Sequence, residues 1–231
     1  MIGNSLHRHR RPPALASNYA RDMNESDYLR LLTRQAEQAN DFLSNARKWE
    51  RECWACQRLL QALKVPYRQE DFVAPTQQPP DVLFRDATFE VFFVLDQGRR
   101  LNEEWKEELL RRRMAQSLNQ LIRREQRPKR IPCAELQARL APTLRKKAHN
   151  YTERGIDPRE LDLLAFVSLK RETPDFNTPF PPPTEYLRQG WRSLSVVGPT
   201  FARVLFAHSD APDFLRGSLG RSILFDMGVG L

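Results

Sequence analysis

An acidic side chain interrupts the most apolar strand that the sequence predicts. Glu90 follows Phe89 and precedes Val91 in a segment rich in Val, Phe and Leu, residues 88–95, a composition typical of a β-strand. A carboxylate buried without a partner is strongly destabilising, so Glu90 needs one. The best candidate is Asp81, another carboxylate, and two adjacent carboxylates repel each other unless a cation lies between them. The pair therefore indicates a divalent metal site.

The two acids are predicted to lie on the two strands of one β-hairpin. Residues 81–84 form the first strand, and a polar break separates them from the strand that contains Glu90. If Asp86 and Ala87 are the hairpin loop, Asp81 and Glu90 become diagonal neighbours on one face of the sheet, about 7–8 Å apart at the backbone. A slip of one residue in the turn would separate them.

The order of these residues resembles the PD-(D/E)xK pattern of the restriction-endonuclease-like superfamily. Asp81 follows a proline, Glu90 lies across a short hairpin, and Phe92 stands where the pattern has its lysine. More narrowly, the chain is similar to a group of uncharacterised bacterial proteins described as endonucleases on fold grounds alone. The resemblance implies an α/β fold with a restriction-endonuclease-like core, a mixed central sheet flanked by helices. It also implies that Asp81 and Glu90 hold Mg²⁺ and that the chain acts on nucleic acid, with Phe92 a departure from the pattern.

Two further positions of the resembled site are open in this sequence. The helix before the hairpin often supplies a third acid to the metal, and Glu52 or Glu50 matches it; the alternative is that both are solvated helix carboxylates. A basic residue must replace the missing lysine. Arg99 and Arg100 follow the second strand directly, and Lys106 lies one turn into the next helix. We take Lys106 as the candidate activator, because arginine stays protonated and is a poor base.

Positive charge is concentrated in the middle of the chain. The 231 residues carry a net charge of +8, and the pI is about 9.7. Residues 99–154 contain 16 basic and 7 acidic side chains, which indicates a polyanionic partner bound in a salt-dependent way. We expect DNA. The candidate contacts are Arg99, Arg100, Arg111, Arg112, Arg113, Arg123, Arg124, Lys129 and Arg130.

Composition excludes several other classes of protein. No apolar run approaches the ~18 residues of a membrane span, and the glycine-rich motifs that bind nucleotide phosphates are absent. Three cysteines, an odd number with no secretory leader, favour a reducing cytoplasm. Cys53 and Cys56 have no second pair to complete a zinc site, so we expect both in a helical core.

The chain is predicted to contain one domain. Residues 1–22 are expected to be a disordered extension: a transit-type leader, a basic arm or, as we favour, a product of an upstream start codon. Residues 23–210 form the domain and residues 211–231 a loosely ordered tail. Periodicity predicts helices at 27–43, 45–63, 102–126 and 133–150, an extended loop at 172–183, and further strands at 67–73, 161–169, 193–197 and 201–207.

Three functions fit these patterns. The first is a Mg²⁺-dependent endonuclease; the second is the same fold with cleavage lost and nucleic-acid binding retained, which Phe92 favours because a large ring beside the acids would displace water. The third is a catalytically inactive protein-interaction module in which Glu90 is paired to an arginine such as Arg99. Binding that weakens steeply with salt separates the first two from the third, and metal-dependent cleavage separates the first from the second.

Overall fold

A mixed seven-stranded sheet organises the chain. The computed structural model describes residues 23–123, 127–182 and 189–225. Its strands follow the order β1-β2-β3-β5-β7-β8-β9, in which β3, β5 and β7 are parallel and the other neighbours antiparallel. The strands of this sheet are β1 (Phe72–Val73), β2 (Val82–Phe84), β3 (Ala87–Leu95), β5 (Asp162–Ser168), β7 (Ser193–Val197), β8 (Phe201–Ala207) and β9 (Ser222–Leu224).

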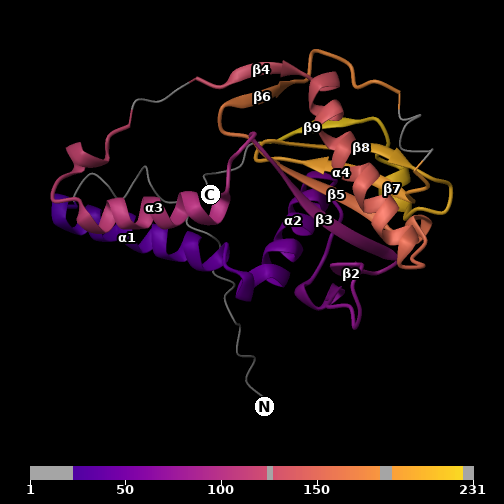
Figure 1. Cartoon of the computed structure of the whole chain (residues 1–231), viewed down its shortest axis with the longest axis horizontal. Helices are drawn as coiled ribbons and strands as arrows, with labels where there is room; N and C mark the ends of the chain where they lie inside the picture. Colours follow the sequence, from indigo (N-terminus) through magenta and orange to yellow (C-terminus); the bar gives the residue numbers. More distant parts are fainter. Residues whose placement is uncertain (1–22, 124–126, 183–188, 226–231) are drawn as a thin grey trace.

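Helices and a small second sheet complete the fold, a mixed α/β arrangement (Figure 1). The α-helices are α1 (Glu25–Phe42), α2 (Lys48–Ala62), α3 (Leu101–Met114), α4 (Cys133–Glu153) and α6 (Asp213–Arg216). Short 3-10 turns are η1 (Asn45–Arg47), η2 (Gln69–Asp71), η3 (Leu118–Leu121) and η4 (Pro158–Glu160). The second sheet pairs β4 (Lys129–Pro132) with β6 (Glu172–Asp175) in parallel.

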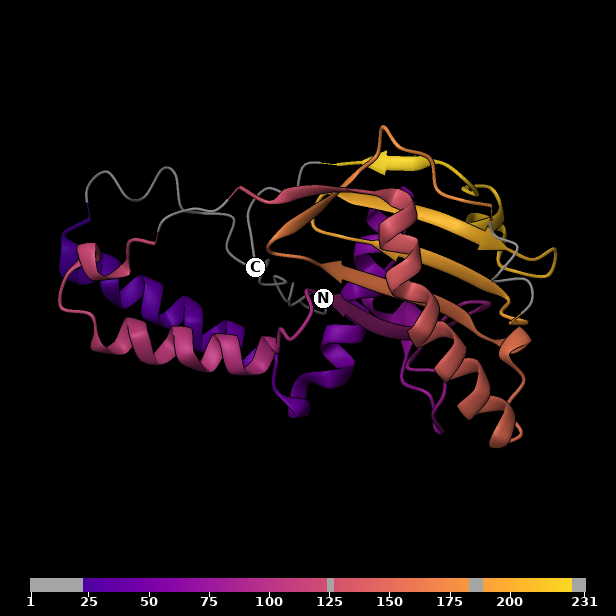
Figure 2. The ribbon, with the colours of Figure 1, turned by 45° about the horizontal axis from the view of Figure 1, so that its top comes forward.

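The two faces of the main sheet bury different helices. Alternate residues of β5 separate cleanly: Leu164 and Phe166 pack with α2, and Leu163 and Ala165 pack with α4, as the period of two in a strand requires. The α4 core positions repeat every four residues, at Leu136, Leu140 and Leu144. One helix therefore covers each face, and the sheet is the middle layer between them (Figure 2).

Helices α1 and α3 lie side by side and project beyond one end of the sheet (Figures 1 and 2). We call this pair the helical arm. Polar contacts connect its helices: Arg112 donates to the Leu32 carbonyl at 2.6 Å, and Arg113 pairs with Glu37 at 2.7 Å. No residue of α3 is buried, so the arm adds little to the core.

Several element boundaries differ from those expected. The helix expected over 102–126 ends at Met114, because its long side chains do not meet the sheet and Ala115 is already extended. The helix expected over 133–150 is α4, which contains the exposed Pro142 and continues to Glu153. The expected extended loop contains β6, and the tail expected after residue 210 contains α6 and β9, which pairs with β8.

Other expectations are confirmed or lie outside the described residues. Cys53 and Cys56 are free and buried in α2, as expected, and Cys133 is also free and buried. Within the described ranges, no helix has the length and apolar character needed to cross a membrane. The expected extension 1–22 and Arg124 are outside the described residues.

Asp162 offers a test of how the sheet is held together. This fully buried carboxylate accepts hydrogen bonds from the Thr88 backbone N–H at 3.0 Å and the Ser193 hydroxyl at 2.7 Å, and it pairs with Arg192. Asp162→Ala leaves these donors and a guanidinium unpaired, so the free energy of unfolding should fall by about 3–5 kcal/mol in urea denaturation. Asp213→Ala is the control, because this aspartate is 90% exposed beside Arg216; it should change stability by less than about 0.5 kcal/mol.

Candidate acid and lysine cleft

A small cleft collects ionisable side chains from three layers of the fold. Its volume is about 240 Å³, and it lies where α2 and α4 approach β3 and the start of β2. Its lining is Lys48, Glu52, Gln78, Pro79, Asp81, Glu90, Val91, Lys147, Tyr151 and Arg154. Both acids of the sequence prediction therefore open into one cleft, joined by the helix acid Glu52. Glu50 instead pairs with Arg47 on the outside of α2.

The hairpin places Asp81 next to Glu90 by a register different from the one expected. Phe84 pairs with Ala87, so the loop is Arg85 and Asp86 rather than Asp86 and Ala87. Ala87 is fully buried and belongs to the strand, while Arg85 takes the left-handed turn conformation, with φ of 53°. The predicted loop was therefore wrong by one residue. The corrected register shifts the pairing by two positions, which preserves the face of every side chain.

Asp81 is locked against the strand that carries Glu90. Its backbone N–H donates to the Phe89 carbonyl at 2.9 Å, and its carboxylate accepts from the Val91 N–H at 3.0 Å. These two bonds flank Glu90 on both sides, which is closer than the expected diagonal arrangement. Asp81 is only 4% exposed, so its carboxylate is fixed beside the second acid.

The partners of Glu90 come from α4, on the face of the sheet opposite α2. It shares the sheet face of Phe92, which α4 covers. From α4, the Lys147 ammonium and the Tyr151 hydroxyl both donate to Glu90 Oε1 at 2.5 Å. The two donors are one helical turn apart, and 3.3 Å separates Lys147 Nζ from the Tyr151 oxygen. Glu90 is therefore held by a lysine and a tyrosine, and the arginine pairing considered from the sequence does not occur.

The third acid, Glu52, shares a cation with Asp81. Lys48 Nζ lies 3.0 Å from Asp81 Oδ1 and 3.3 Å from Glu52 Oε1. Lys48 and Glu52 are four residues apart on α2, the spacing that places two side chains on one helix face. The lysine side chain is 48% exposed, whereas that of Glu52 is 6% exposed. A solvent-accessible ammonium therefore occupies the position between two buried carboxylates.

Burial and mutual repulsion shift the protonation of the acids. Burial, followed by the negative charge of Asp81, raises the pKa of Glu52 to about 7 against the opposing effect of Lys48. Burial and Asp81 also raise the pKa of Glu90, against the opposing effects of Lys147 and Tyr151. The pKa of Tyr151 is raised because its hydroxyl is buried and bonded to Glu90. Three acids this close are harder to ionise together than separately.

The donor set suits a hard divalent cation. Asp81, Glu52 and Glu90 offer carboxylate oxygens, the ligands that Mg²⁺ prefers, and the Lys48 ammonium shows that a positive charge fits between the first two. In their present rotamers, no group of three or more His, Cys, Asp or Glu side chains in the described ranges is arranged to hold a metal ion. A cation bound here would therefore compete with Lys48, and its ligands would have to rearrange.

The residues proposed from sequence to replace the motif lysine lie elsewhere. Lys106 is on the exposed side of α3 in the helical arm and does not line the cleft. Arg99 pairs with Glu104 at 2.6 Å, and Arg100 pairs with Glu103. Phe92, at the lysine position of the pattern, is 8% exposed in the core beneath α4. The assignment of Lys106 to this site is therefore corrected.

Many of the basic residues expected to contact DNA are paired within the chain. Glu108 alone receives Arg111, Arg112 and Arg123, which reduces the charge they can offer to phosphates. Arg113 pairs with Glu37. Lys129 and Arg130 are exposed on β4.

Sequence reasoning missed Lys48, Lys147 and Tyr151. A signal was available in their spacing, since Lys48 precedes Glu52 by four residues and Lys147 precedes Tyr151 by four. Nothing in that spacing indicates that the two helices meet across a hairpin from opposite faces of a sheet. These contacts span 33 residues for Lys48 and Asp81 and 57 for Lys147 and Glu90.

The family of the chain follows from comparison with known proteins. A family model described as "Putative endonuclease, protein of unknown function (DUF1780)" matches residues 24–231. The chain belongs to this family, whose description leaves its function open.

A solved structure is similar to the chain along most of its length. It is that of a protein of unknown function from Pseudomonas aeruginosa strain PAO1, described as belonging to the monooxygenase superfamily. The two are 72% identical, the match covers 90% of this chain and 100% of that one, and the TM-score is 0.67. No curated protein matches the chain.

Glu52→Gln should change how stability depends on pH. Glu52 binds its proton up to about pH 7 when folded but only to about 4.5 when unfolded, so the wild type loses stability as pH rises between these values. The variant lacks this loss. Its free energy of unfolding relative to wild type should rise by up to roughly 3 kcal/mol between pH 4.5 and 8.

The measurement is urea denaturation at several pH values with a chelator present. Glu50→Gln is the matched control, because this exposed glutamate lies on the same helix outside the cleft. If Glu52→Gln and the wild type changed stability in parallel at every pH, the raised pKa of Glu52 would be contradicted.

Proposed function

We propose that the chain is a divalent-metal-dependent endonuclease in which Lys147 replaces the lysine missing at Phe92. The observation that carries the proposal is the convergence of three buried carboxylates and two lysines in one open cleft. The family description, which names an endonuclease, agrees with it. The chain order α2-β1-β2-β3-α3-β4-α4-β5, with β3 and β5 parallel, also agrees with the restriction-endonuclease-like core that the sequence resembles, if α3 and β4 are taken as an insertion between β3 and α4.

Three carboxylates would hold the cation, Mg²⁺ or Mn²⁺. Asp81 is fixed by its bond to the Val91 N–H, Glu90 lies beside it, and Glu52 approaches from α2. A divalent cation supplies Lewis-acid activation in the hydrolysis of a phosphodiester. The raised pKa values of Glu52 and Glu90 support this assignment, because acids crowded in the absence of an ion are stabilised when one binds.

Lys147 brings positive charge to the side of the cleft that Phe92 faces. Its ammonium lies 5.9 Å from the centre of the Phe92 ring and 2.5 Å from Glu90 Oε1. A lysine at position 92 would extend from the strand toward the same helix. Helix α4 thus places a lysine ammonium near position 92, where the sequence has no lysine. In this role the ammonium stabilises the negative charge that develops on a phosphate under attack.

Tyr151 and Arg154 complete the arrangement on α4. Tyr151 donates to Glu90 and fixes the carboxylate orientation. Arg154 lines the cleft and donates to the Gln78 carbonyl at 2.9 Å. Three cations, Lys48, Lys147 and Arg154, balance the three carboxylates, so a bound divalent ion would leave the cleft positive and suited to a phosphodiester.

A nucleic-acid-binding protein without cleavage is the second candidate. The acids already have lysine partners, and Phe92 occupies the motif position with a core side chain. If these ammonium groups outcompete the metal, the fold keeps its basic surface and loses hydrolysis.

Oxidation chemistry finds less support in this cleft. The similar Pseudomonas aeruginosa protein is described as belonging to a monooxygenase superfamily. Cofactor pockets are mostly apolar and about 300–1,000 Å³ in volume, whereas this cleft is smaller and lined largely by ionisable groups. The side chains present favour hydrolysis of a charged substrate.

The direct test is cleavage of supercoiled plasmid with Mg²⁺ or Mn²⁺, followed on gels. The wild type should cleave in either metal and stop when a chelator is added. Asp81→Asn should lose cleavage because it removes the fixed carboxylate. Lys147→Met keeps roughly the length of the side chain but removes its charge. It should reduce the rate of plasmid cleavage about 10²–10³-fold.

Lys146→Met is the matched control, because Lys146 is the exposed neighbour of Lys147 on α4 and does not line the cleft. It should cleave like the wild type. Salt-sensitive plasmid binding without cleavage in either metal would support the second candidate instead. Cleavage that Asp81→Asn retains would refute the proposed site, and a fully active Lys147→Met would refute the role of Lys147.

A further inference from the structure

Among the residues that the structure describes, one face of α3 in the helical arm has no partner. No residue of this 14-residue helix is buried, although isolated helices of that length are marginally stable in water. Leu110 is 59% exposed and Met114 is 72% exposed. The two are four residues apart and therefore form a continuous apolar stripe on the helix surface.

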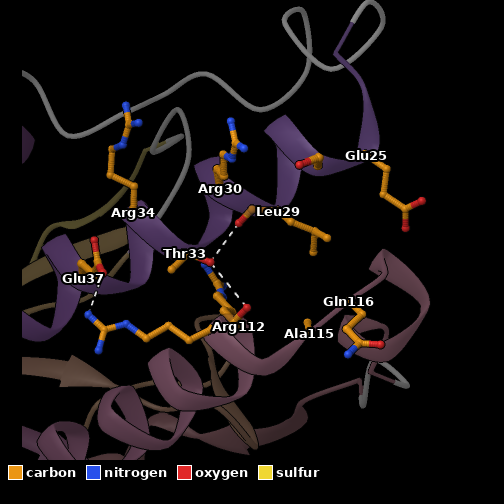
Figure 3. Close-up of a pocket in the computed structure, with 11 residues that line it drawn as sticks. Glu25, Leu29, Arg30, Thr33, Arg34, Glu37, Arg112, Ala115 and Gln116 are labelled. Carbon is orange, nitrogen blue, oxygen red and sulfur yellow. Dashed lines mark hydrogen bonds and ion pairs between the residues drawn. The ribbon is translucent and has the colours of Figure 1, made fainter.

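The partner helix α1 does not cover this stripe. It meets α3 on the opposite side through the bond from Arg112 to the Leu32 carbonyl, while Arg113, on the flank between that contact and the stripe, reaches Glu37. Figure 3 shows the groove between the helices, with Thr33 of α1 bonded to the Arg112 carbonyl of α3. The volume of this groove is about 770 Å³. Its lining includes arginine side chains from both helices and the glutamates Glu25 and Glu37 from α1.

Charge along α3 is arranged in two halves of opposite sign. The first part carries Glu103, Glu104, Glu107 and Glu108 with the single lysine Lys106, and the last turn carries Arg111, Arg112 and Arg113. The exposed stripe follows the same order, with Glu107 before Leu110 and Arg113 after it. Two antiparallel copies of such a helix would bring the acidic half of each against the basic half of the other.

We infer that the exposed face of α3 is a homodimer interface, in which α3 packs against α3 of a second copy about a twofold axis near Leu110. Positions related by this axis are complementary. Leu110 meets its own counterpart, Glu107 faces Arg113 of the second copy, and Met114 packs against the aliphatic part of Lys106. A twofold contact of this kind is self-complementary and closes at two subunits. Joining two helical arms also creates a four-helix bundle, which buries apolar stripes that a pair of helices leaves exposed.

The first test is the mass of the full chain in solution, measured by light scattering during size exclusion over a concentration series. The wild type should have twice the mass of the 27.0 kDa chain. Leu110→Glu combined with Met114→Glu should give a monomer with unchanged circular dichroism. Val73→Glu is the matched control: it adds a carboxylate at an exposed apolar position of β1, 53% exposed and distant from the arm, and should remain a dimer.

A charge swap tests the register and does not depend on the apolar variant folding. Glu107→Arg alone should weaken the dimer, since it places two cations in contact. Combining it with Arg113→Glu should restore association, because the pair keeps its attraction with the signs exchanged. A wild-type chain that is monomeric at the highest concentration would overturn the inference. So would a dimer that persists both in the double variant Leu110→Glu, Met114→Glu and in Glu107→Arg. Failure of the charge swap to restore the dimer would overturn the proposed register.

Discussion

Three carboxylates buried within one cleft are the constraint on which the rest of this structure depends. Asp81, Glu52 and Glu90 are each about 5% exposed or less, and their mutual repulsion must be offset. The fold does this with lysines from helices on opposite faces of the sheet, Lys48 on α2 and Lys147 on α4. Each lysine reaches the acids because its helix packs closely on its own face. The apolar cores on the two sides therefore also position the charges.

The sequence predicted the acids of the cleft but not their counter-ions. Asp81 and Glu90 could be found because a carboxylate in an apolar strand is conspicuous, and the alternation of side chains placed both on one face. The turn was misassigned because Arg85 and Ala87 compete as loop residues on local propensity. Burial of Ala87 decides between them, and burial depends on contacts distant in sequence. Lys147 could not be assigned for the same reason, since its partner lies 57 residues away.

Secondary structure could be predicted where the spacing of apolar residues is regular. The prediction failed where tertiary contacts decide which segments form an element. The stripes of α2 and α4 and the apolar run of β5 match the observed elements closely. Helix α3 was expected to extend to Gln126 because apolar residues recur at helical spacing as far as Ile122, yet it ends at Met114, where no surface supports it. Strands β4 and β6 were not expected, because each is short and stable only beside the other.

The two hydrogen bonds of Asp81 to either side of Glu90 have a consequence for assembly of the cleft. They belong to the hairpin, so the acids are brought together as soon as β2 and β3 pair. The balancing ammonium groups arrive only when helices distant in the chain dock on both faces. Until then the hairpin carries uncompensated negative charge. Charge repulsion between the two acids thus opposes formation of the isolated hairpin. The charges of the hairpin are balanced only when the helices have docked in the complete tertiary fold.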